Sequence, residues 1–99
     1  MYVAVAGSSV SLEQPEDTRR FKVSAATGSD VDGALRANGW GEIEGDDALV
    51  SVEAIRRAAA GRVSDGWAAD FQAMLDYARG KGWLTSDGMR IRAHVEVGG

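Results

Sequence analysis

Alternation of apolar and polar residues predicts β-strands near both ends of the chain. Residues 2–6 are a short apolar run rich in valine, as expected of a buried strand. Residues 20–25 and 89–97 place apolar side chains on one face and polar ones on the other. These three segments should therefore share an antiparallel sheet that is buried on one face. Residues 10–12 are a candidate extension of the sheet, and residues 48–50 a candidate strand fragment.

Apolar residues spaced three or four positions apart predict three helices. The first covers residues 31–37 and is ended by Asn38-Gly39, and the second covers residues 52–60 and is ended by Gly61. The acidic residues 42–47 between them are expected to form a connecting loop. The third helix, residues 64–79, is the longest, with Ser64 as its N-cap. Its apolar positions form one stripe, namely Trp67, Phe71, Met74, Leu75 and Ala78.

The length and composition of the chain predict one globular domain. Ninety-nine residues are enough to bury one hydrophobic core, and 44% of them are hydrophobic and 26% charged, which is ordinary for globular proteins. We therefore expect a single α+β domain over residues 1–99. In this fold a small antiparallel sheet is covered by three helices.

The order of elements in the second half of the chain resembles a winged helix-turn-helix domain. The matching segments are residues 52–60, 64–79 and 83–97. The last is a predicted hairpin with Ser86-Asp87-Gly88 as its turn and Gly82-Trp83-Leu84 at its entry. Counted from the first helix, the resemblance covers about 70 of the 99 residues. It implies that the second and third helices form a nucleic-acid reading unit and that the hairpin is the wing.

Charge argues against nucleic acid as the partner of this chain. The sequence has 15 acidic and 11 basic residues, for a net charge of −4. The third predicted helix, which would enter the major groove, carries Asp65, Asp70 and Asp76 against Arg79 alone. Because an acid-rich helix repels the phosphate backbone, nucleic acid is not the expected partner.

Cysteine content and hydropathy bear on the compartment. The chain has no cysteine, which excludes disulfides and thiol chemistry and fits a reducing compartment. No apolar run approaches the ~18 residues that a membrane-spanning helix needs. The apolar N-terminal segment lacks the preceding basic residue of a signal peptide. We therefore expect a cytoplasmic protein without membrane contact.

The polar face of the last predicted strand is the most distinctive candidate binding surface. It carries Arg90, Arg92, His94 and Glu96. Arg20 and Lys22 lie on the polar side of another strand, so two neighbouring strands would form a cationic stripe. Such a stripe would bind a carboxylate or phosphate of a small ligand through forked guanidinium contacts. The alternative is that these bases pair with Glu42 or Glu44 across a solvated sheet face.

The sequence predicts no catalytic, metal or cofactor site. His94 is the only histidine, and its one candidate partner for acid–base work is Glu96. The acids that follow Asp30 do not have the spacing of a calcium-binding loop. Gly28 and Gly33 are not followed by the lysine and hydroxyl residue of a phosphate-binding loop. We therefore expect neither a metal nor a cofactor.

The three tryptophans each lie next to a glycine. Trp67 begins the helical stripe and Trp83 opens the predicted hairpin, so both are expected in the core. Trp40 has no periodic position. It is either an anchor in an interface or the residue that closes the core over the first helix.

These features favour a non-enzymatic protein-interaction or binding module that can self-associate. One alternative is binding or conversion of an anionic small molecule at the face of Arg90, Arg92 and His94. A second alternative is nucleic-acid binding by a winged helix.

Overall fold

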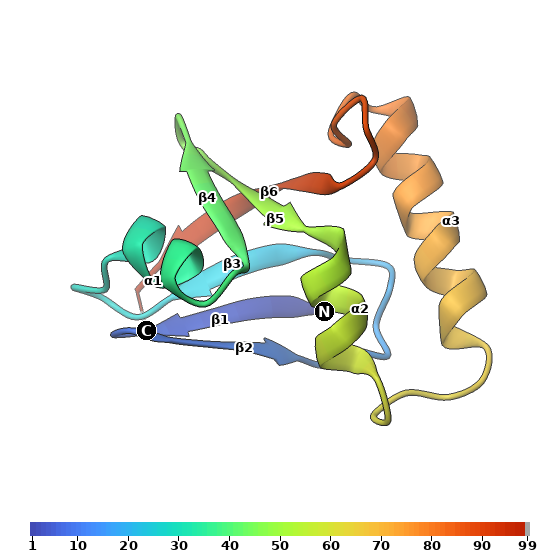
Figure 1. The fold of residues 1–99 in the computed structure, drawn as a ribbon, viewed down its shortest axis with the longest axis horizontal. Helices are drawn as coiled ribbons and strands as arrows, with labels where there is room; N and C mark the ends of the chain where they lie inside the picture. The colour runs from blue at the N-terminus through green and yellow to red at the C-terminus, as the bar shows by residue number, and fades with distance from the viewer. Residues whose placement is uncertain (99) are drawn as a thin grey trace.

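Six strands and three helices make up residues 1–98, which the computed structural model describes (Figure 1). The strands are β1 (Tyr2–Ala6), β2 (Ser9–Glu13), β3 (Lys22–Ala25), β4 (Gly41–Glu44), β5 (Asp47–Ser51) and β6 (Arg90–Val97). The helices are α1 (Val31–Ala37), α2 (Val52–Ala59) and α3 (Trp67–Gly80). None of these helices is long and apolar enough to span a membrane.

The strands form one mixed sheet, in the order β2-β1-β3-β6-β5-β4, which curls into a half-barrel. β1 is parallel to β3 and β3 is parallel to β6, whereas the other three pairings are antiparallel. The prediction of a small antiparallel sheet is therefore wrong. Alternation identifies a strand but not its direction. The direction depends on whether the connection leads to the start or to the end of the strand that becomes its neighbour. Residues 14–21 cross the start of β1, so β3 runs parallel to it.

The resemblance to a winged helix is also wrong. A wing is a hairpin beside the helices, whereas β6 lies inside the sheet between β3 and β5. Before β6, the predicted first strand of the wing is reduced to an isolated bridge between Leu84 and Ile91. α3 begins three residues later than predicted. Ser64 is not the N-cap, because its hydroxyl donates to the Glu16 carboxylate and its carbonyl accepts from the backbone N–H of Trp67, in the turn before the helix.

Two tight hairpins contain β2, β4 and β5, the strands that periodicity identified only in part or not at all. β1 and β2 are joined by Gly7-Ser8, and β4 and β5 by Gly45-Asp46. The first residue of each turn has a positive φ, +60° at Gly7 and +65° at Gly45. This is the requirement of a type II′ turn, whose twist suits a two-residue hairpin. The predicted acidic connector 42–47 is therefore mostly hairpin.

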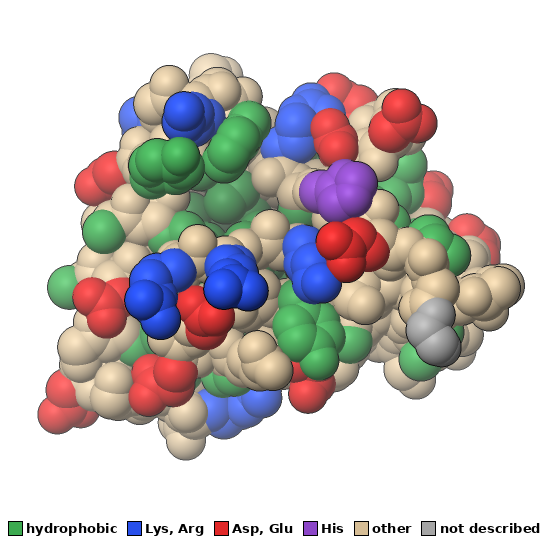
Figure 2. Space-filling view, turned by 180° about the vertical axis from the view of Figure 1, so that it is seen from behind, with side chains coloured by type: hydrophobic (Ala, Val, Ile, Leu, Met, Phe, Trp, Pro, Cys, Tyr) green, Lys and Arg blue, Asp and Glu red, His purple; other side chains and the backbone are tan. Residues whose placement is uncertain are grey.

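One face of the sheet and all three helices share one hydrophobic core. Its largest fully buried side chains are Val3, Val5, Leu12, Val23, Leu35, Val50, Ile55 and Phe71. In α3 the rings of Trp67 and Phe71 stack with centroids 4.7 Å apart. The indole N–H of Trp67 donates to the carbonyl of Pro15 at 2.6 Å, which fixes the connection before β3 against α3. The other face of the sheet is polar, and Figure 2 shows it uncovered.

Side chains from the helices and their connections cover both edges of the sheet. At β2, the Arg62 guanidinium donates to the carbonyl of Leu12 at 2.9 Å. At β4, the backbone N–H of Ile43 donates to the Asp32 carboxylate of α1 at 2.8 Å. Asn38, at the end of α1, donates to the carbonyl of Ser8 in the first hairpin turn. These bonds occupy edge groups that another strand would otherwise use.

Candidate functional site

The structure places four predicted ligand-binding residues on the uncovered face of the sheet. Along β6, Ile91 and Ala93 are buried, whereas Arg90 and His94 are exposed and Arg92 is half-buried. β3 is the neighbour of β6, as the predicted stripe requires, and Lys22 lies on the same face as Glu96. We call Arg90, Arg92, His94, Lys22 and Arg20 the basic face. In Figure 2 the histidine lies between acidic and basic side chains.

Acidic side chains occupy most of this basic face. Arg90 pairs with Glu42, and Arg92 lies 2.8 Å from Glu44 and 3.4 Å from Asp47. Asp47 projects from β5, which is the neighbour of β6, and Glu42 and Glu44 project from β4, which lies beyond β5 on the same face. The hydrogen bond to Glu44 is the main reason that the pKa of Arg92 is raised. Of the pairs that the alternative predicted, the structure therefore shows those of Arg90 with Glu42 and of Arg92 with Glu44.

Lys22 is also paired, through its Nζ atom 2.7 Å from a Glu96 carboxylate oxygen. This hydrogen bond lowers the pKa of Glu96 below its ordinary value. Arg20 precedes β3 instead of lying within it, and its side chain and that of His94 form no ion pair within residues 1–98. The described residues also contain no cluster of three or more potential metal ligands.

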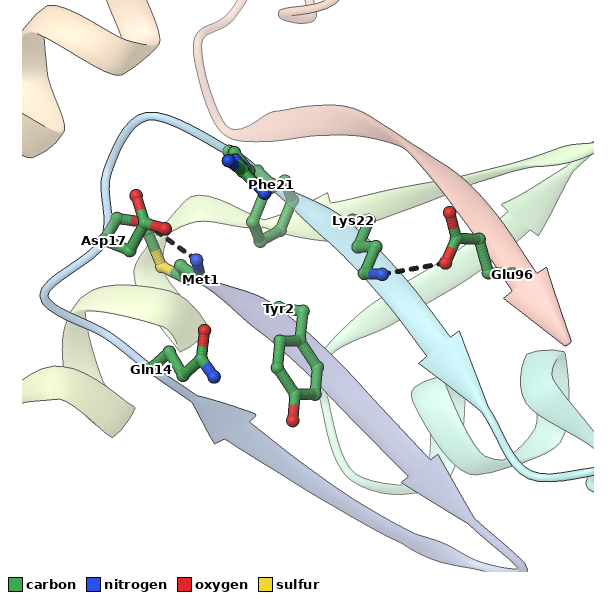
Figure 3. Close-up of a pocket in the computed structure, with 8 residues that line it drawn as sticks. Met1, Tyr2, Gln14, Asp17, Phe21, Lys22 and Glu96 are labelled. Atoms are coloured by element: carbon green, nitrogen blue, oxygen red, sulfur yellow. Dashed lines mark hydrogen bonds and ion pairs between the residues drawn. The ribbon is translucent and has the colours of Figure 1, made fainter. Parts of the chain in front are cut away.

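A depression of about 470 Å³ lies at the Arg20 and Lys22 end of the basic face, where β1 and β3 begin (Figure 3). It is lined by Met1, Tyr2, Gln14, Asp17, Arg20, Phe21, Lys22 and Glu96. The Met1 amine donates to the Asp17 carbonyl at 2.8 Å, and burial lowers the pKa of that amine. Two pairs of polar groups in the depression therefore bond each other, Met1 with Asp17 and Lys22 with Glu96.

The structure places Trp40, the predicted interface residue, in the core. Its exposed fraction is 9%. Its backbone N–H donates to Leu35 and its carbonyl accepts from Ser51, which fixes the chain between α1 and β4. Trp40 therefore offers little surface to a partner.

The exposed aromatic residues lie at the end of α3 instead. Tyr77 is 61% exposed and Trp83 is 44% exposed, so the expectation that Trp83 lies in the core is wrong. Their rings meet edge to face with centroids 6.0 Å apart. The Lys81 ammonium lies 5.5 Å from the centre of the Tyr77 ring. We call Tyr77, Trp83 and Lys81 the aromatic surface.

A hollow of about 350 Å³ adjoins the aromatic surface. It is lined by Thr18, Arg19, Asp70, Ala73, Met74 and Tyr77. In Figure 2, hydrophobic side chains gather around a hollow at the end of the molecule where α3 lies. The sequence contained one signal for this surface, because Tyr77 is an aromatic residue outside the apolar stripe of its helix. Helical periodicity therefore turns Tyr77 away from the core.

No protein-family model matches the chain, and no curated protein or solved structure resembles it beyond chance. The function must therefore be argued from its own residues.

Proposed function

We propose that this protein is a non-enzymatic protein-interaction module that binds its partner through the aromatic surface. The observation that carries the proposal is the pair of Tyr77 and Trp83, which are ordered against each other and yet exposed. Large amphipathic rings contribute much of the binding free energy in protein interfaces, and they lose little rotamer freedom when they bind.

The backbone around Trp83 supports the proposal because it holds this surface in place. The N–H of Trp83 donates to the carbonyl of Ala78 at 2.8 Å, and its carbonyl accepts from Arg92 at 2.6 Å. Trp83 is thus bonded to both α3 and β6. A surface that is ordered before binding has less conformational entropy to lose when the partner arrives.

The basic face gives weaker support to the alternative of an anionic small molecule. A ligand there would have to displace Glu42 and Glu44 from Arg90 and Arg92. These carboxylates belong to the same chain, so they compete at a high effective concentration. The alternative of a nucleic-acid reader rested on the winged-helix order, and the fold removes that basis.

The proposal is tested by affinity capture with three forms of the protein. The double variant Tyr77→Ser, Trp83→Ser removes the aromatic surface. Met89→Ser is the matched control, since Met89 is also 61% exposed, lies just before β6 and does not line the hollow beside Tyr77. We expect the wild type and the control to retain the same partners and the double variant to lose them. Equal capture by all three folded proteins would refute the proposal.

Thermal unfolding tests the anion alternative on the same samples. A ligand at 100 times its dissociation constant stabilises a protein by about 2.7 kcal/mol. For a domain of this size, each kcal/mol raises the Tm by about 4–8 °C. We expect no shift with phosphate or citrate. A shift that Arg90→Ser and Arg92→Ser together remove would favour the basic face.

A further inference from the structure

One side of α3 carries a line of exposed residues separate from its buried stripe. Asp70, Ala73, Tyr77 and Lys81 follow one another at intervals of three or four residues, so they lie along the same side of the helix. All four are exposed, whereas Phe71 on the adjacent side is fully buried. We call this line the α3 flank, and it passes through the aromatic surface at Tyr77 and Lys81.

The α3 flank is charged at both ends and has opposite signs there. Asp70 lies in the first turn of α3, and Lys81 follows its last residue. The eleven residue steps from Asp70 to Lys81 correspond to about 16 Å along the helix axis. Neither side chain forms an ion pair with any residue of the described chain, 1–98. The middle of the flank, at Ala73 and Tyr77, is uncharged.

This pattern is complementary to itself when one copy is reversed. In an antiparallel pair of α3 helices, Asp70 of each copy faces Lys81 of the other. Tyr77 of each copy then faces Met74 of the other, beside the hollow that Ala73 and Met74 line. A parallel pair would instead bring like charges together at both ends. The antiparallel pair has twofold symmetry, so it closes as a dimer and does not continue as a fibre.

We infer that a second copy of this chain is a partner of the aromatic surface and docks antiparallel along the α3 flank. The inference rests on the proposed function, because it names the partner of the same surface. A single helix flank buries less area than the roughly 800 Å² per partner of a standard interface. The dimer should therefore be weak and should form as the protein concentration rises.

The test is sedimentation velocity of the full chain at concentrations from about 1 to 500 μM, a range suited to a weak interface. Asp70→Lys and Lys81→Asp should each weaken the dimer by roughly tenfold, since twofold symmetry repeats every like-charge contact. The double variant Asp70→Lys, Lys81→Asp restores opposite charges and should recover the wild-type dissociation constant. Asp76→Lys, the same change on another side of α3, is the matched control and should leave the dimer intact.

Recovery of the dissociation constant in the double variant shows that the single changes weaken the dimer at its interface and not by destabilising the fold. Both single changes place unfavourable charges at the ends of the helix dipole, so the double variant should be the least stable of the three. If the changes acted only through folding, the double variant would also associate least. Thermal unfolding of each variant, measured alongside, shows that the dimerising samples are folded.

The remaining outcomes distinguish this inference from the proposed function. Docking along the α3 flank is refuted if the protein stays monomeric at every concentration. It is also refuted if the dissociation constant of the dimer is the same in the wild type and in the two single charge variants. The proposed function would then stand if Tyr77 and Trp83 were still needed to capture a different protein. If removing both rings affected neither the dimer nor capture, the inference and the proposed function would fail together.

Discussion

Substituting alanine for Gly41 should destabilise the protein strongly, because the backbone at the start of β4 leaves no space for a side chain. Gly41 has a φ of +142°, a conformation that other residues rarely adopt. It pairs with Val50 of β5. A Cβ at this position would overlap the carbonyl oxygen of Leu49 and lie 3.1 Å from the Cα of Val50. These are backbone atoms of the paired strand, so no side-chain rotation can relieve the overlap.

The expected loss of stability has two sources. Backbone strain in a sparsely populated region costs about 1–3 kcal/mol. Displacing a packed neighbour costs about another 1–3 kcal/mol. Gly41→Ala should therefore lower the free energy of unfolding by roughly 2–6 kcal/mol. This is a large part of the ~5–15 kcal/mol that stabilises a typical domain.

Gly45→Ala, in the turn of the same hairpin, is the matched control. Gly45 also has a positive φ, +65°, but a Cβ there would meet no atom within 4 Å. Only the conformational cost remains, about 1–3 kcal/mol. Urea unfolding followed by tryptophan fluorescence measures both variants, and an unchanged m-value shows that the comparison is valid. Equal losses in the two variants would refute the register of Gly41 opposite Val50.

Two further predictions concern the contacts that hold the sheet edges. The backbone N–H of Ile43 in β4, and after it Arg36, hold the pKa of Asp32 below its ordinary value. The Asp32 carboxylate therefore stabilises the fold fully at pH values above its ordinary pKa. This stabilisation is lost as the pH falls through the lowered pKa. Between pH 7 and pH 2.5, the free energy of unfolding measured by chemical denaturation should therefore change less with pH in Asp32→Asn than in Asp46→Asn. Equal pH dependence in the two variants would contradict this role of Asp32. Arg62→Ala uncovers the Leu12 carbonyl at the edge of β2, so it should aggregate faster on mild heating, as measured by light scattering, than Arg57→Ala, whose native arginine pairs within α2.

Local periodicity was sufficient to find most of the elements, because it reports which face of each element is buried. The stripe that includes Trp67 and Phe71 identified α3, and the alternation around Ile91 identified β6. β4 was missed because its two glutamates belong to the acidic run 42–47, which has the composition of a solvated loop. Its charges face the arginines of the sheet, so a segment that resembled an acidic loop is a strand.

Strand direction and neighbours could not be predicted from local pattern. The parallel pairing of β3 with β6 brings together Val23 and Val95, which are far apart in the sequence. That pairing depends on the whole path through β4, β5 and the last two helices. The alternative of arginine pairing did identify the contacts of Arg90 with Glu42 and of Arg92 with Glu44, because opposite charges on one face of a sheet attract each other whichever way the strands run.

Two tryptophans with similar neighbours in the sequence differ in how far they are buried. Trp40 and Trp83 both follow a glycine, yet Trp40 is buried between α1 and β4 and Trp83 is exposed. The difference arises from the fold, since α3 ends just before Trp83 and leaves its ring against Tyr77 on the surface. Tyr77 was the better guide, because its position outside the helical stripe is visible in the sequence alone.

Charge pairing explains why the α3 flank, and not the basic face, is the stronger candidate for binding. On the sheet, Arg90 and Arg92 already have carboxylate partners, so a ligand must break these pairs before it gains new ones. On α3, Asp70 and Lys81 have no ion-pair partner within residues 1–98, and the exposed ring of Tyr77 lies between them. A partner that docks there gains ion pairs and buried aromatic surface without opposing the contacts that stabilise the fold.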